Sequence, residues 1–175
     1  MSETSDASRQ PLMLIVEDRD VMRAMLHEFV QNAFPACAIL DAATGGHAMK
    51  LCAEHRPDLV LMDVNLPDAN GIELTTRVRI QWPTTRVIVF SYLGTDAHVE
   101  RASIAGAFAY VAKDRLIPDL IPAITGALGI ARSSAPGDGP PRDRDNPGAD
   151  TGVSRIRESA CGPYIRRPLQ KERMP

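Results

Sequence analysis

The chain is 175 residues long, 44% of them hydrophobic, with a formal net charge of -2 at pH 7. This length allows one domain of ordinary size with some additional chain. The near-neutral charge excludes a strong electrostatic attraction of the whole chain to nucleic acid. No stretch approaches the roughly 18 consecutive apolar residues that a membrane-spanning helix needs. The polar first ten residues lack the apolar core of a signal peptide.

The three cysteines indicate a reducing environment. Cys37, Cys52 and Cys161 are an odd number of thiols at no metal-binding spacing. Cys37 and Cys52 lie in apolar segments, which is typical of buried free thiols. Together with the absence of a membrane span and of a signal-peptide core, this predicts a cytoplasmic protein.

The first part of the chain predicts two strands and a helix. Residues 1–10 are polar and are expected to form a disordered leader. The apolar run 12–16 predicts a buried strand that ends in Glu17 and Asp18. Apolar residues at helical spacing begin at Val21, with Asp20 as the expected N-cap, and a short strand follows over 37–42.

The middle of the chain repeats this alternation. Thr44 is expected to cap a helix that runs to about residue 55, although two glycines at its start weaken the prediction. A third strand is predicted over 58–62, with Asp63 just beyond it. Asn70 and Gly71 then open a helix that ends near Trp82.

Two further strand–helix units complete the pattern. A strand over 86–90 ends in Ser91 and precedes a helix over 96–105. A strand over 108–112 ends in Lys113 and precedes a last amphipathic helix. Pro118 suits the first turn of that helix, whereas Pro122 predicts a kink or a late start.

Five strands alternating with five helices predict one α/β domain over residues 11–131. Such alternation is typical of a parallel sheet with helices on both faces. About 120 residues for five units matches the flavodoxin-like strand order 2-1-3-4-5. Residues 132–175 are rich in Pro, Gly and Arg and are expected to be a disordered tail. The tail has no helix-turn-helix pattern, so no direct DNA binding is expected.

Chemically reactive side chains stand at the carboxyl ends of four of the predicted strands. Glu17 and Asp18, then Asp63, Ser91 and Lys113 should meet in one crevice. Three carboxylates there would repel one another unless a divalent cation joined them. Mg²⁺ prefers such oxygen ligands. Asp18 and Asp63 are expected to bind it directly and Glu17 through water.

The same crevice suits a phosphoryl group. Asp63 is a carboxylate of the kind that forms an aspartyl phosphate. Mg²⁺ and Lys113 would neutralise charge on the phosphoryl oxygens, and the hydroxyl of Ser91 would donate a hydrogen bond to one of them. The backbone carbonyl of Asn65 is also expected to reach the cation.

At this point the sequence resembles the receiver domains of two-component response regulators over roughly residues 11–131. The resemblance is carried by the segments 16–18, 61–71, 90–91 and 105–114. The last segment is most similar to receivers of the LuxR/NarL group. The resemblance implies Asp63 as phosphoacceptor, Lys113 as the lysine typical of the family, and Ser91 and Tyr110 as a switch pair. It also implies a histidine kinase or histidine phosphotransfer protein as phosphodonor.

The sequence departs from the family pattern in three places. Tyr92 stands where a small residue is usual, and its ring would shield a phosphoryl group on Asp63. Asp114 replaces a common proline, as it often does in the LuxR-like group. The third departure is the tail, which takes the place of a helix-turn-helix domain. Output would therefore be binding to a protein, to a partner regulator or to a second copy of the chain.

Other functions fit particular residues of the sequence to different degrees. A pseudo-receiver that binds its partner without phosphorylation is favoured by Tyr92. The receiver part of a truncated LuxR-type regulator is equally compatible with the tail. A flavin-binding flavodoxin is disfavoured because Glu17 and Asp18 would repel a phosphate-bearing cofactor. A haloacid-dehalogenase-type phosphatase typically needs a second Asp at the position of Asn65. His27, His47, His55 and His98 are expected to be solvent-exposed and unpartnered.

Overall fold

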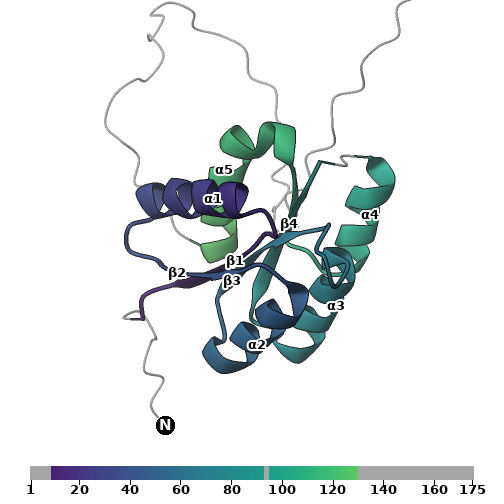
Figure 1. The fold of residues 1–175 in the computed structure, drawn as a ribbon, viewed down its shortest axis with the longest axis horizontal. Helices are drawn as coiled ribbons and strands as arrows, with labels where there is room; N and C mark the ends of the chain where they lie inside the picture. Colours follow the sequence, from purple (N-terminus) through teal and green to yellow (C-terminus); the bar gives the residue numbers. More distant parts are fainter. Residues whose placement is uncertain (1–8, 93–94, 130–175) are drawn as a thin grey trace, which may run out of the picture.

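The computed structural model describes residues 9–92 and 95–129, which form one parallel sheet covered by helices (Figure 1). The strands are β1 (Leu12–Val16), β2 (Ala38–Ala42), β3 (Leu59–Asp63), β4 (Arg86–Ser91) and β5 (Ala109–Ala112). The helices are α1 (Asp20–Ala33), α2 (Gly45–His55), α3 (Gly71–Gln81), α4 (Asp96–Ile104), the short 3-10 turn η1 (Lys113–Arg115) and α5 (Leu116–Leu128). Residues 1–8 of the predicted leader 1–10 and the whole of the predicted tail 132–175 lie outside the described residues.

The sheet has the predicted strand order β2-β1-β3-β4-β5, and every pairing is parallel. The central strand β3 is buried along its whole length, because helices cover both of its faces. One core layer joins the sheet to α1 and α5, with Leu26 and Leu120 fully buried. The other joins it to α2, α3 and α4 around Val78 and Trp82. The flavodoxin-like fold predicted from the sequence is therefore confirmed.

The local signals at the starts of α2 and α3 are also confirmed. The Thr44 hydroxyl accepts a hydrogen bond from the His47 N–H, and the Asn70 side chain accepts one from the Ile72 N–H. Gly106, just beyond the end of α4, has a φ of 86°, a conformation that favours glycine. Among the described residues, no helix is long and apolar enough to cross a membrane.

Three local predictions were wrong. Asp20 is the first residue of α1 rather than its N-cap; Arg19 precedes the helix, and the Asp20 carboxylate pairs with Arg23. Of the two outcomes predicted for Pro122, a kink or a late start, the late start is wrong, because α5 already begins at Leu116 and includes Pro122. The packing of its apolar face outweighs the lost donor at that proline.

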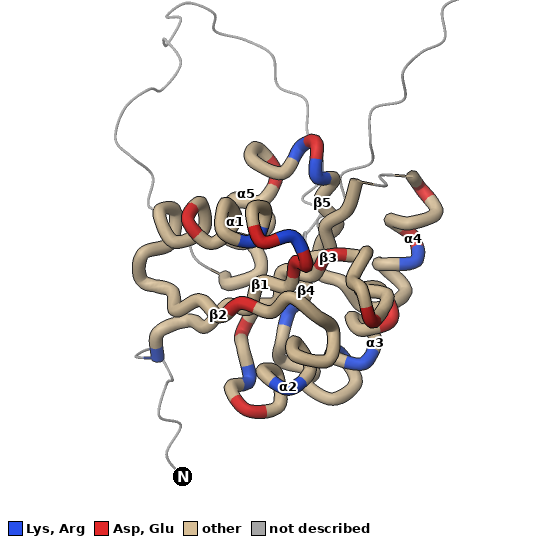
Figure 2. Tube along the Cα trace, viewed as in Figure 1, with Lys and Arg blue, Asp and Glu red and all other residues tan. Residues whose placement is uncertain are grey.

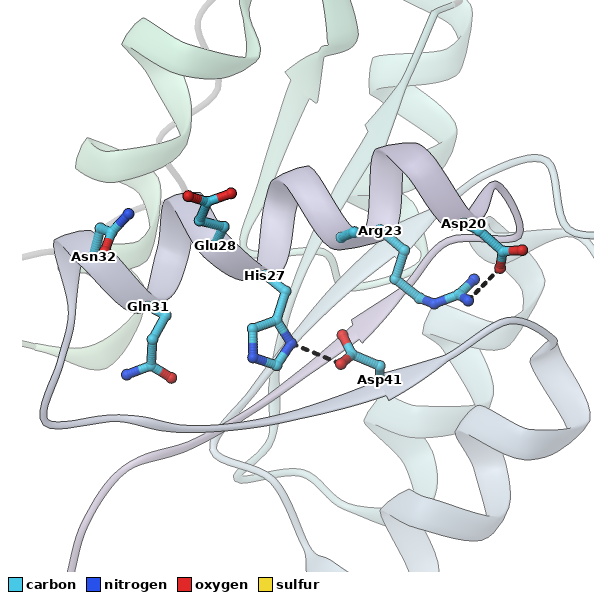
Figure 3. A pocket seen from close by; sticks show the side chains of 8 residues that line it. Asp20, Arg23, His27, Glu28, Gln31, Asn32 and Asp41 are labelled. Atoms are coloured by element: carbon cyan, nitrogen blue, oxygen red, sulfur yellow. Dashed lines mark hydrogen bonds and ion pairs between the residues drawn. The ribbon is translucent and has the colours of Figure 1, made fainter.

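The third error concerns His27, which was expected to have no partner. Its Nδ1 lies 2.6 Å from an Asp41 carboxylate oxygen, and the pair joins α1 to β2 (Figure 3). His98 is also partnered, by the Thr95 hydroxyl at 2.6 Å. The His27 contact depends on where β2 lies beside α1, so helical spacing did not predict it, whereas the His98 contact is local to the start of α4.

Candidate functional site

The acidic and basic side chains predicted to meet do so at the carboxyl edge of the sheet. Glu17 follows β1, Asp63 ends β3 and Lys113 follows β5, and all three are buried. Lys113 Nζ donates to Glu17 Oε2 at 2.7 Å and to Asp63 Oδ2 at 2.9 Å. Figure 2 shows acidic positions gathered beside the ends of β1 and β3. A single buried ammonium thus joins two carboxylates that come from different strands.

The third carboxylate completes a cluster that fits a divalent cation. The cluster consists of Glu17, Asp18 and Asp63, and one carboxylate oxygen from each residue lies within 4.8 Å of the other two. Asp18 is exposed, whereas the other two residues are buried. Asp63 Oδ1 is buried and has no hydrogen-bond partner within the described part of the chain. A buried carboxylate oxygen that accepts no hydrogen bond is costly, and a bound cation would supply the missing favourable interaction. The oxygen-only ligand set is the one that Mg²⁺ prefers.

Arg23 fixes the loop that carries the acidic pair. Its guanidinium donates to the backbone carbonyl of Glu17 at 2.7 Å, and it also binds Asp20. The Arg19 N–H donates to Glu17 Oε1 at 3.3 Å. These contacts hold the turn between β1 and α1 in place, so the carboxylate of Asp18 is presented at the mouth of the site.

Burial changes the pKa of the Glu17 carboxyl. Loss of hydration raises the pKa of this carboxyl above its ordinary value of 4.5. The hydrogen bond from Lys113 opposes the shift, and the negative charge of Asp63 adds to it. The ionised form of Glu17 is therefore less favourable in the folded protein than in the unfolded chain.

We expect Glu17→Gln to stabilise the metal-free protein by about 1 kcal/mol near neutral pH, because the amide stands in for the neutral carboxyl. The raised pKa means that the folded wild-type protein binds more protons. Its stability should therefore decline as pH rises from 4.5 through the raised value. Urea denaturation at several pH values would measure both effects. If the variant is less stable than the wild-type protein at neutral pH, the hydrogen bond from Lys113 to the ionised carboxylate contributes more to stability than the burial of that charge costs.

Gly71 is a residue of the site that sequence reasoning treated only as a helix start. An added Cβ at this position would lie 1.9 Å from the backbone oxygen of Asp63. The Gly71 N–H donates to the Val64 carbonyl at 2.9 Å, which brings the two segments together. The start of α3 thus packs directly against the backbone of Asp63, and only glycine permits that approach.

We expect Gly71→Ala to destabilise the protein by about 2–3 kcal/mol or more, because the backbone of Asp63 must move to accommodate the methyl group. Chemical denaturation measures the loss. Gly126→Ala in α5 is the matched control, since its Cβ would meet Phe108 at an ordinary 3.5 Å. The control should be neutral or slightly stabilising. If the two variants are equally stable, the close approach of Gly71 to the backbone oxygen of Asp63 is contradicted.

The predicted switch pair is brought together by the register of β4 and β5. Tyr110 lies opposite Val89, and Ser91 opposite Ala112, so Ser91 and Tyr110 share one face of the sheet. Burial raises the pKa of the half-buried Tyr110 phenol, and a side-chain hydrogen bond with Ser91 opposes the shift. The negative charge of Asp63 also raises this pKa, which places the phenol within electrostatic reach of the acidic cluster.

Tyr92 lies over the entrance to the cluster. Its ring centre is 5.0 Å from Lys113 Nζ and 5.5 Å from the guanidinium carbon of Arg19, distances at which a cation is attracted to an aromatic face. The side chain remains 55% exposed. Tyr92 therefore touches the site at one edge and solvent at the other. Asn65, the remaining predicted ligand, is exposed and its backbone pairs with Asn70.

An open groove of about 660 Å³ lies beside α1 and is separate from this cluster (Figure 3). Its lining includes Asp20, Arg23, Glu28 and the His27–Asp41 pair. Asp20 and Arg23, and likewise His27 and Asp41, are turned toward one another in this view. The His27–Asp41 pair thus joins α1 to the edge strand β2, whereas the Asp20–Arg23 pair lies within α1.

Fold and site together define a class, the flavodoxin-like α/β proteins with a buried lysine and an acidic pocket at the carboxyl edge of the sheet. Residues 13–125 match the response regulator receiver domain. The chain is 36% identical to the transcriptional regulatory protein PdtaR of Mycobacterium tuberculosis over 120 residues, 69% of this chain and 58% of PdtaR. It is 30% identical to chemotaxis protein CheY of Halobacterium salinarum over 116 residues, 66% of this chain and 95% of CheY.

A solved structure agrees with these sequence matches. The crystal structure of a LuxR-family two-component response regulator from Aurantimonas sp. SI85-9A1 has a TM-score of 0.65 and 30% identity, covering 73% of this chain and 91% of that one. The chain belongs to the response regulator receiver domain family. Receiver domains are signalling modules rather than classical enzymes, and they bind Mg²⁺ at an acidic pocket. The chain spans between half and three-fifths of the transcriptional regulators that it matches.

Proposed function

We propose that this protein is a phosphorylation-controlled receiver in which Asp63 accepts a phosphoryl group from a histidine kinase or a histidine phosphotransfer protein. In the transfer, the bond between phosphorus and the donor imidazole nitrogen breaks, and a bond from phosphorus to an Asp63 oxygen forms. The observation that carries the proposal is the asymmetry of Asp63. Lys113 holds Oδ2 at 2.9 Å, while Oδ1 is buried without a hydrogen-bond partner in the described residues.

The neighbouring groups have distinct proposed roles. Asp18 and Asp63 bind Mg²⁺, with Glu17 acting through water and Asn65 contributing its backbone carbonyl. The cation, when bound, neutralises charge that develops on the phosphoryl oxygens. Lys113 supplies a second positive charge, and the Ser91 hydroxyl donates a hydrogen bond to the phosphoryl group.

Switching would proceed through Ser91 and Tyr110. If Ser91 turns toward the phosphoryl group, its hydrogen bond with Tyr110 is exchanged for a new one, and the ring settles in a different position. The surface formed by α4, β5 and α5 then changes shape, as a shift between two populated states. The output is binding to a protein partner or to a second copy, in the cytoplasm. Residues 1–10 and 132–175 flank this receiver of residues 11–131 as a leader and a tail.

The test is to incubate the protein with Mg²⁺ and acetyl phosphate and to follow its intact mass over time. We expect one added phosphoryl group, which hydroxylamine removes and which EDTA prevents from forming. Absence of the adduct, with the fold intact and Mg²⁺ bound, would contradict the proposal. The decay rate of the adduct also reports how far Tyr92 protects it from water.

One observation favours a second candidate, the pseudo-receiver. The Tyr92 ring lies 5.0 Å from Lys113 Nζ, so it occupies space through which a phosphodonor would approach. A protein that forms no adduct but binds a partner with unchanged affinity in the presence and absence of a phosphodonor would be such a module. The acetyl phosphate experiment separates the two candidates.

A further inference from the structure

A carboxylate from a different segment of the chain accepts hydrogen bonds from the first turn of α2. The helix has no acidic residue in its own first turn. Instead, the N–H groups of Gly45 and Gly46 each donate to one carboxylate oxygen of Asp68, both at 2.8 Å. N–H groups at a helix start lack partners within the helix, and an anion there is favourable.

Asp68 belongs to the loop of residues 64–70, which directly follows Asp63 and contains Asn65. The base of this loop is fixed to the sheet and to itself, through Val64 N–H to the Phe90 carbonyl at 3.3 Å and through the Asn65–Asn70 bridge. Asp68 connects the tip of the loop to α2. One carboxylate thus joins the segment beside the phosphoacceptor to a helix on the same side of the sheet.

Gly45 makes this connection sterically possible. A Cβ at Gly45 would lie 2.6 Å from Leu74 Cδ1 and 3.0 Å from Ala69 Cβ. A side chain there would therefore push the loop away from the helix. The hydrogen bonds from Gly46 and Gly45 also lower the pKa of Asp68, so the carboxylate remains ionised while it binds them. The close approach accounts for the glycine at position 45, whereas a Cβ at Gly46 would lie at an ordinary 3.4 Å from Asp68 Oδ2.

We propose that Asp68 is a positioning residue for the metal site: by holding the 64–70 loop against α2, it keeps the Asn65 carbonyl placed to bind Mg²⁺ beside Asp63. The inference rests on the proposed function and assigns a role to a residue outside the ligand set. Without the contact between Asp68 and α2, the cation must order the loop as it binds. The entropy lost in that ordering opposes binding, so the Mg²⁺ affinity falls. Coupling is reciprocal, so bound Mg²⁺ must in turn strengthen the contact between Asp68 and α2.

The test compares two variants of the full chain that both remove an acceptor at the start of α2. Asp68→Ala removes the contact between loop and helix, whereas Thr44→Ala removes only the helix cap. Isothermal titration with Mg²⁺ should show roughly tenfold weaker binding for Asp68→Ala, the range typical of residues that orient metal ligands. Thr44→Ala should lower thermal stability but leave the Mg²⁺ affinity within about twofold, because the helix cap is not part of the loop.

Amide hydrogen exchange at Gly45 and Gly46 provides a readout independent of affinity. Mg²⁺ should slow exchange at both glycines in the wild-type protein and in Thr44→Ala, but not in Asp68→Ala. Asp68→Asn, which keeps one accepting oxygen, should lie between the extremes and replaces Asp68→Ala if that variant does not fold. Equal Mg²⁺ affinity of wild type and the Asp68 variants would overturn this inference alone. A wild-type protein that binds no Mg²⁺ would overturn the metal site as well.

Discussion

Replacement of Asp63 by Asn is expected to abolish the phosphorylated species completely. The amide has the size of the carboxylate but lacks its nucleophilic oxygen, so no acyl phosphate can form. The fold should survive, because the amide oxygen still accepts a hydrogen bond from Lys113 and one of two buried negative charges is removed. Intact mass after incubation with acetyl phosphate and Mg²⁺ measures the effect.

The matched control for this experiment is Asp41→Asn. Asp41 also lies near the carboxyl end of a strand, but it faces His27 across the groove beside α1 rather than the acidic cluster. Phosphorylation of this variant should proceed as in the wild-type protein. If Asp63→Asn acquires the same hydroxylamine-sensitive mass as the wild-type protein, the phosphoacceptor is another residue.

Replacement of Lys113 by Ala is expected to destabilise the metal-free protein by about 3–5 kcal/mol, the loss typical when one partner of a buried ion pair is removed. The variant leaves Glu17 and Asp63 buried without the ammonium that joins them, and these carboxylates are 0% and 2% exposed. Without Lys113, repulsion by Asp63 favours the protonated form of Glu17 in the folded state, because it raises the pKa of that carboxyl. The stability of the variant should therefore rise as pH falls, since its native state binds more protons than its unfolded state.

Mg²⁺ should restore much of the lost stability, because a cation bound only to the folded state stabilises it by about 2.7 kcal/mol at a hundred times its dissociation constant. Urea denaturation with EDTA and with Mg²⁺ measures both effects. Lys50→Ala is the control: that lysine is 71% exposed and pairs with Glu54 at 3.9 Å, so its loss should change stability by less than about 0.5 kcal/mol. A Lys113 variant that Mg²⁺ does not stabilise would contradict the placement of the metal site.

The expected behaviour of the two variants follows from one arrangement. Lys113 offsets part of the negative charge of the cluster, and it contacts Asp63 Oδ2, while Oδ1 has no donor among the described residues. Asp63 Oδ1 would then be the oxygen available to a ligand that enters the pocket. The pocket is thus built around charges that remain unbalanced until a ligand enters.

The sequence by itself determined the fold and the composition of this pocket. Apolar runs at strand length and apolar residues at helical spacing defined the alternating elements, and parallel pairing requires their carboxyl ends to meet at one edge. That rule brought Glu17, Asp63 and Lys113 together although they are far apart in the chain. The order of the elements and their apolar patterns were sufficient to predict the fold and the residues of the pocket. Apolar pattern depends only on neighbouring residues, and the meeting of the strand ends depends only on the topology of the sheet.

The tertiary structure alone decided how the pocket is supported. The contact of Asp68 with α2, the approach of Gly71 to the Asp63 backbone, the His27–Asp41 pair and the position of Tyr92 all join segments separated along the chain. No periodicity encodes such contacts, because they depend on the distance between two loops or between a loop and a helix. The same reason explains why α5 does not start late at Pro122, since the packing of its apolar face outweighs the local preference of proline. The error at Asp20 is local instead, because this residue begins α1 and pairs with Arg23 one turn further along the same helix.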